Sequence, residues 1–257
     1  GCARIRARSL PAVEGMTPHS GSIQKNAARI AGMFDAIAPQ YDLLNNLLSV
    51  GMDRRWRDKA VEVLQLAGDE TMLDLCTGTA DLALTAVRRT EGSLKQVVGI
   101  DFAEGMLSLG QAKVHRKGYG DSLHLVRGDA SSIPMSTASV DAAAIGFGIR
   151  NVEDPAAVCA ELRRVLNPGG RLAILEFGFP SLPVLRQVYQ WYFTRILPSI
   201  GHLISRHPEA YSYLPASVSS FLVPEAFTGL LRRAGFERIR DLPLSCGIVH
   251  LYVAVKT

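Results

Sequence analysis

The middle of the chain alternates short apolar runs with amphipathic stretches, and this alternation constrains the fold more than any other feature. Strands that alternate with helices along a chain build parallel βαβ units, with helices on both sides of one sheet. The pattern therefore predicts a doubly wound, mostly parallel α/β fold. The expected strands are 71–75, 97–101, 123–126, 140–147 and 171–177, and the expected helices between them are 81–89, 104–117 and 155–165.

The segments on either side of this alternation are mostly helical. Apolar residues recur at helical spacing over 25–67, where Pro39 is expected to interrupt the helix, and they predict an N-terminal helical cap. An aromatic-rich stretch near 182–214 reads as a helical insertion. A helix at 224–234 and two strands, 236–241 and 248–255, are expected to close the fold. We expect a tail at 1–24, disordered, followed by a single domain at 25–257.

The composition and net charge of the chain argue against several classes of function. The 257 residues are 47% hydrophobic, enough for one α/β core, and no run of apolar residues is long enough to span a membrane. The net charge of +4 comes without a basic run interleaved with aromatics, so no nucleic-acid partner is expected. The four scattered cysteines, with no metal-binding spacing, indicate free thiols, a cytoplasmic protein and no metal.

The first strand leads into the loop Asp74-Leu-Cys-Thr-Gly-Thr-Ala-Asp81, which is the expected cofactor loop. Gly78 permits a tight turn, but the other glycines of a dinucleotide-binding loop are missing. Two flanking acids suit a sulfonium and an ammonium group better than a diphosphate. The loop therefore indicates S-adenosylmethionine. Asp74 is either a direct ligand contact or an anchor of the loop.

Two further strand ends carry acids in the order that such a cofactor requires. Asp101 follows Gly78 by twenty-three residues and is placed to accept hydrogen bonds from ribose hydroxyls, although it could also cap the next helix. Asp129 and Ala130 follow the third strand and offer a carboxylate and a backbone N–H to an adenine edge. Asp129 could instead bond its own backbone within a turn.

Several longer segments resemble the ubiquinone/menaquinone biosynthesis C-methyltransferase family. The resemblance runs from about Met33 to Lys256, and its most particular motif is Phe-Gly-Ile-Arg-Asn. It implies a class I (Rossmann-like) methyltransferase. Cys76 and Ala80 depart from the family pattern, which has glycines there. The matching segments are Met33–Asp42, Gly51–Trp56, Leu73–Asp81, Phe147–Asn151, Leu166–Leu172, the Tyr211 and Tyr213–Leu214 stretch, and Gly247–Val249.

The resemblance implies transfer of a methyl group from S-adenosylmethionine to a ring carbon of a prenylated quinol, with demethylmenaquinol as the expected substrate. The alternatives are the benzoquinol step of ubiquinone biosynthesis and a non-catalytic scaffold of a quinone-synthesising complex. By matching positions, the cofactor contacts are Thr79, Asp101, the pair Asp129–Ala130, and Gly146 through its backbone. Tyr41 is expected to lie over the cofactor, although helix packing would explain it as well.

Methylation of a ring carbon requires a phenolic oxygen that loses its proton, so the site must stabilise a phenolate or hold a base. We assign Arg150 the electrostatic role and Asn151 the positioning role, because both follow the fourth strand directly. Arg150 could instead pair with Glu176 or Asp154 and only brace the site. His250 is a second candidate base.

The stretch near 182–214 has two readings. Leu185, Val188, Tyr189, Tyr192 and Ile196 fall on one helical stripe. This stripe could cover the core, or it could receive the prenyl chain and touch a bilayer. Two partners besides the quinol are therefore compatible with the sequence. These are the inner face of a membrane, contacted peripherally, and a second copy of the chain.

Overall fold

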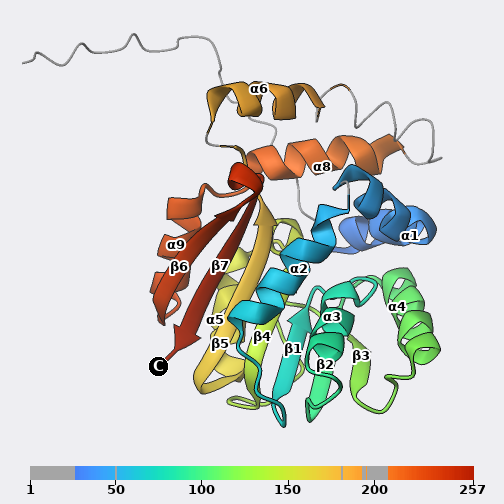
Figure 1. Ribbon diagram of the computed structural model, residues 1–257, viewed down its shortest axis with the longest axis vertical. Helices are drawn as coiled ribbons and strands as arrows, with labels where there is room; N and C mark the ends of the chain where they lie inside the picture. The colour runs from blue at the N-terminus through green and yellow to red at the C-terminus, as the bar shows by residue number, and fades with distance from the viewer. Residues whose placement is uncertain (1–26, 50, 181, 193–194, 196–207) are drawn as a thin grey trace, which may run out of the picture.

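A computed structural model of the chain describes residues 27–257, with the exception of 50, 181, 193–194 and 196–207. Seven strands form one sheet in the order β3-β2-β1-β4-β5-β7-β6, with β7 antiparallel to both of its neighbours (Figure 1). The predicted mostly parallel, doubly wound sheet is confirmed. The strands are β1 (Thr71–Leu75), β2 (Gln96–Asp101), β3 (Leu123–Arg127), β4 (Val140–Gly146), β5 (Leu166–Phe177), β6 (Phe236–Leu244) and β7 (Val249–Lys256).

Helices cover both sides of the sheet and its carboxyl edge. One side packs against α2, α3 and α4, the other against α5 and α9, while α1, α6 and α8 lie beyond the carboxyl ends of the parallel strands (Figure 1). The helices are α1 (Ala27–Leu48), α2 (Met52–Val63), α3 (Asp81–Arg89), α4 (Glu104–Lys117), α5 (Pro155–Val165), α6 (Pro183–Trp191), α8 (Pro208–Ser220) and α9 (Pro224–Arg233). Short 3₁₀ turns follow at Ile149–Asn151 and Ser245–Gly247.

The central strands are apolar on both faces because both faces are covered. In β4 the run Ala142–Ala144 and Ile145 are fully buried, and the small side chains allow helices to approach closely from either side. The helix α5 begins sharply, since the Asp154 side chain accepts hydrogen bonds from the backbone N–H groups of Ala156 and Ala157.

Strand register brings the predicted loops to one edge. Leu75 pairs with Ile100 and with Ile145 across the β2-β1-β4 triplet. The segments that follow these three strands therefore start at the same level. Because β1 lies between β2 and β4, Gly78, Asp101 and the end of β4 are side by side. This is the point where the strand order reverses, and α/β proteins bind ligands there.

The expected interruption at Pro39 is wrong, because α1 runs through it without a break. A proline inside a helix removes one backbone hydrogen bond, but tertiary contacts hold the helix on both sides of it. Ala31 and Ala38 pack against Ala103 and Met106 near the start of α4.

The helix α6 differs from the predicted stripe. Tyr189 is buried, whereas Val188 is 56% exposed, so these two neighbours face opposite sides. Ile196 and the tail at 1–24 lie outside the described residues. In the part of the chain that the structure describes, no helix is both long and apolar enough to cross a bilayer.

Candidate active site

A pocket opens at the carboxyl edge of the sheet, between the loops that follow β1 to β4 and the helix α1. Five residues predicted to bind the cofactor line it, one or two from each loop: Gly78, Asp101, Asp129, Ala130 and Gly146. The four loops therefore meet at one pocket. Their assignment to particular ligand atoms stays a prediction.

The loop after β1 is held from beneath by Asp74. Its carboxylate is buried and accepts hydrogen bonds from the Thr77 hydroxyl at 2.6 Å and from the Ala83 N–H at 3.0 Å, both through Oδ2. The other oxygen, Oδ1, has no hydrogen-bond partner among the described residues. Burial raises the pKa of Asp74 to about 7. Since Asp74 does not line the pocket, the geometry favours its role as an anchor of the loop.

Asp101 faces the pocket and also organises its floor. Its Oδ2 accepts a hydrogen bond from the Gly78 N–H at 2.8 Å, and its Oδ1 accepts one from the Ala103 N–H at 2.9 Å. Burial raises the pKa of this carboxyl above its usual value, and the backbone hydrogen bonds oppose that shift. A carboxylate has about four lone-pair positions, so Asp101 keeps acceptor capacity for a ligand hydroxyl.

The third and fourth loops complete the polar side of the pocket. Asp129 accepts hydrogen bonds from the backbone N–H and the hydroxyl of Ser131, which is the turn that sequence reasoning kept as an alternative. Gly148 fits closely against the first loop, because a Cβ atom at this position would lie 2.4 Å from the Cβ of Cys76. The first and fourth loops therefore touch.

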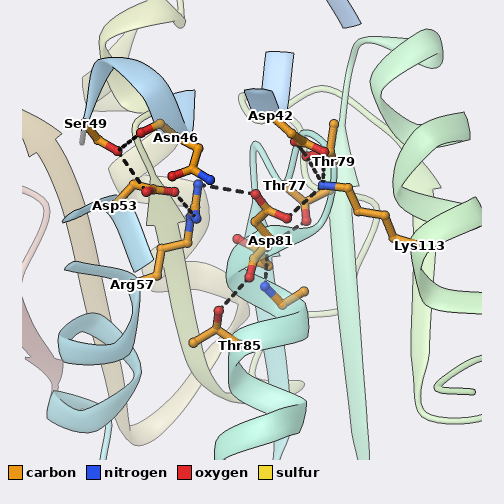
Figure 2. A network of polar contacts seen from close by, with 12 residues as sticks. Asp42, Asn46, Ser49, Asp53, Arg57, Thr77, Thr79, Asp81, Thr85 and Lys113 are labelled. Atoms are coloured by element: carbon orange, nitrogen blue, oxygen red, sulfur yellow. Dashed lines mark hydrogen bonds and ion pairs between the residues drawn. The ribbon is translucent and has the colours of Figure 1, made fainter. Parts of the chain in front are cut away.

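Two predicted cofactor contacts, Thr79 and Tyr41, are not among the described residues that line the pocket. Thr79 is buried, and its hydroxyl binds Asp42 of α1 and Lys113 of α4 rather than facing the pocket (Figure 2). Tyr41 belongs to α1, but its side chain lies outside the described part of the structure. The predicted cofactor contact of each residue stays a prediction.

Arg150 makes the ion pair that sequence reasoning considered as its structural alternative. It is 5% exposed, its Nη1 lies 2.7 Å from Glu176 Oε1, and it also donates to the carbonyl oxygen of Phe147. Its guanidinium lies 5.3 Å from the centre of the Phe177 ring. Its Nε has no hydrogen-bond partner among the described residues. Arg150 thus braces the turn that carries Asn151.

Asn151 lines the pocket, and its side-chain oxygen accepts a hydrogen bond from the Tyr213 hydroxyl of α8 at 3.1 Å. Burial raises the pKa of Tyr189 and Tyr213, Arg150 lowers it, and Glu176 raises it. The phenolic form of both tyrosines is therefore favoured, and the nearby Arg150 opposes this shift.

His250, the second candidate base, lies in β7 opposite Glu176. Its Nδ1 is 2.8 Å from Asp241, and its ring packs so closely on Gly178 that a Cβ there would lie 2.5 Å from His250 Cδ2. The carboxylate fixes the ring orientation. His250 does not line the pocket.

Sequence reasoning missed the apolar half of the pocket. Ile30, Ala31 and Phe34 of α1 and Met106 of α4 line it, opposite the acids. Their spacing is that of ordinary core residues, and only the position of α1 over the sheet edge shows that they face a ligand.

The residues that line the pocket fit S-adenosylmethionine. Gly78, with φ of 56°, lines the pocket without a side chain, Asp101 offers acceptor capacity, and the apolar wall suits an adenine ring and a methionine chain. Among the described residues no cluster of three His, Cys, Asp or Glu side chains could hold a metal ion. Fold and site together define a class I S-adenosylmethionine-dependent methyltransferase.

Comparison with known proteins narrows this class. The model of the ubiE/COQ5 methyltransferase family matches residues 22–256, and the chain belongs to this family. The chain is 43% identical over 235 residues to the ubiquinone/menaquinone biosynthesis C-methyltransferase UbiE of Geobacter sp. (strain M21), covering 91% of the chain and 99% of that relative. It is 36% identical over 243 residues to the demethylmenaquinone methyltransferase of Bacteroides fragilis, covering 95% and 98%.

Solved structures confirm the fold. A SAM-dependent methyltransferase from Aquifex aeolicus superposes with a TM-score of 0.59 at 17% identity, over 90% of this chain and 99% of that one. The [4+2]-cyclase SpnF gives a TM-score of 0.65 at 17% identity, over 90% and 96%. Because the second of these proteins is a cyclase, the fold by itself does not determine the reaction.

Proposed function

We propose that this enzyme transfers the methyl group of S-adenosylmethionine to a ring carbon of a prenylated quinol, with demethylmenaquinol as its substrate. The observation that carries this proposal is a pocket lined by Asp101 and Asn151, in a chain of this family. Arg150, which precedes Asn151 in the chain, does not line this pocket and is buried in its pair with Glu176. The names of the relatives, which include both menaquinone and ubiquinone biosynthesis, support a quinol ring as acceptor.

Bound S-adenosylmethionine supplies an electrophilic methyl group, and the residues of the chain prepare the acceptor. Asn151 and Tyr213 present a linked amide and hydroxyl where the pocket meets α8, so they can orient a quinol hydroxyl. The guanidinium of Arg150, the chain neighbour of the pocket residue Asn151, stabilises negative charge that develops on that oxygen. Positioning and electrostatics of this kind supply much of the rate in such transfers.

The substrate is tested with labelled S-adenosylmethionine and a panel of reduced, demethylated quinols. We expect transfer of label to demethylmenaquinol and much slower transfer to the benzoquinol of ubiquinone synthesis. The opposite preference would support the ubiquinone alternative. Cofactor binding without transfer to any quinol would support the non-catalytic scaffold.

The role of Arg150 needs a variant that leaves no unpaired buried charge. Arg150→Gln combined with Glu176→Gln removes both members of the pair, while cofactor affinity is measured separately. We expect kcat to fall by at least about tenfold. Full turnover in this double variant would show that Arg150 only braces the site.

We further propose that α6 contacts a membrane surface, where a prenylated quinol resides. Val184, Val188 and Trp191 fall on its outer side and are 76%, 56% and 59% exposed, while Tyr189 on the inner side packs beside Phe179. Flotation with anionic liposomes tests this contact. Val184→Asp with Val188→Asp should abolish flotation, whereas the control Val126→Asp, in the distant edge strand β3, should float as the unchanged protein does. No flotation of the unchanged protein would refute the proposal.

A further inference from the structure

A cluster of charged side chains connects α1, α2, α3 and α4 and includes Lys113 of α4 (Figure 2). Its ammonium nitrogen is 2.5 Å from Asp42 Oδ2 and 2.8 Å from Asp81 Oδ1, and it donates to the Thr79 hydroxyl at 2.8 Å. Thr79 in turn donates to Asp42 Oδ1 at 2.7 Å. Because an ammonium group has three donors, these contacts use the whole group. One side chain thereby joins α1, the cofactor loop and the start of α3.

The cluster continues away from Lys113 to the beginning of α2. Arg57 lies 3.3 Å from the second oxygen of Asp81 and 2.7 Å from Asp53, which accepts a hydrogen bond from Ser49 (Figure 2). The side chain of Lys113 is only 13% exposed and that of Arg57 only 11%. Salt screens such partly buried pairs less than surface pairs, so they hold the elements together more firmly.

The helix that this cluster fastens forms one wall of the pocket. Phe34 of α1 lines the pocket, and Asp35 accepts a hydrogen bond from the Gly105 N–H at 2.7 Å. Among the described side chains, apolar contact between α1 and α4 is made by Ala31, Phe34 and Ala38 of α1, which pack with Met106 and Leu109 of α4. Polar contacts add to this packing in keeping α1 over the pocket.

We propose that Lys113 is a positioning residue for the cofactor and that it acts as a latch, holding α1 closed over the loop after β1. Lys113 does not itself line the pocket, so it acts through Thr79 and Asp42. Without it, Asp81 keeps its contact with Arg57, but the cation that links Asp42 to Asp81 is lost, and the repulsion between these two carboxylates favours movement of α1 away from α3. The closed state binds the cofactor, and a lower population of that state weakens the apparent affinity in proportion. This inference rests on the methyltransferase assignment but not on the identity of the quinol.

The experiment measures binding of S-adenosylhomocysteine by calorimetry and compares KM with kcat. For Lys113→Met we expect Kd and the KM for S-adenosylmethionine to rise by about tenfold, with kcat at saturating cofactor nearly unchanged. Lys113→Arg should recover most of the affinity. The control is Lys59→Met, which removes a lysine from the exposed pair with Glu62 on α2 and should leave affinity unchanged.

Hydrogen exchange of the backbone amides over 27–48 distinguishes a positioning role of Lys113 from a merely structural one. Cofactor should slow exchange there in the unchanged protein and much less in Lys113→Met. If Lys113→Met does not fold, Asp42→Asn, whose side chain is 42% exposed, takes its place and should weaken binding in the same direction. Unchanged Kd in a folded latch variant would overturn the proposal. Failure of the unchanged protein to bind S-adenosylhomocysteine would instead overturn the cofactor assignment.

Discussion

The buried carboxyl of Asp74 makes a prediction about how stability depends on pH. Burial raises its pKa in the folded protein from 3.8 to about 7. Between these two values the unfolded chain has lost the proton that the folded chain keeps. The contribution of Asp74 to the free energy of unfolding therefore falls as pH rises through this window, and it stays low above about pH 7.

The size of this effect follows from the pKa shift. A shift of about three units corresponds to roughly 4 kcal/mol as an upper limit, at about 1.4 kcal/mol per unit. Asp74→Asn removes the titration and preserves the hydrogen bonds. The amide oxygen can replace Oδ2, which accepts from Thr77 and Ala83, and the NH₂ group then replaces the partnerless Oδ1.

Urea unfolding of the unchanged protein and of Asp74→Asn from about pH 4 to about pH 8 checks this prediction, because other titrating groups cancel in the difference. The variant should gain stability relative to the unchanged protein as pH rises, by up to roughly 4 kcal/mol. Asp121→Asn, at an exposed position, serves as the control. A stability difference that stays constant over this range would refute the late titration of Asp74.

Further substitutions test the packing of the site and the role of His250. Arg150→Met leaves Glu176 buried without its cation and should lower the free energy of unfolding by about 3–5 kcal/mol in denaturant titrations. Gly148→Ala should weaken cofactor binding, since its Cβ would overlap Cys76, and Cys76→Gly in the same chain should restore the calorimetric Kd. His250→Asn should leave kcat nearly unchanged, because His250 does not line the pocket, whereas a large loss of kcat with unchanged cofactor affinity would identify His250 as the base.

The sheet and the pocket loops could be predicted because each depends on local patterns. Apolar runs alternating with helical segments determine parallel strands, and the acids at the strand ends then meet at one edge whatever their distance in the chain. Asp101 is the clearest case. Its spacing from Gly78 predicts that both residues lie at the same edge of the sheet, and in the structure they are joined by a hydrogen bond.

Other features depend on tertiary contacts that no local pattern carries. Lys113 and the residues that it contacts come from three separate segments of the chain. The sequence around Lys113 therefore shows only a lysine on an amphipathic helix. Pro39 is a helix breaker by local rules, but packing of α1 against α4 overrides that preference. The apolar stripe expected on α6 places Val188 with Tyr189, although neighbours in a helix point about 100° apart and the structure separates them.

We propose above all that the enzyme transfers a methyl group from S-adenosylmethionine to a ring carbon of a quinol bound at this pocket. It is tested most directly by incubating the purified protein with methyl-labelled cofactor and reduced demethylmenaquinol, and by identifying the product by mass spectrometry. The account predicts one labelled methyl group on the ring carbon, and loss of transfer when Asp101→Ala removes the acceptor positions in the pocket. Label on an oxygen atom, or none on any quinol while cofactor binds normally, would contradict it.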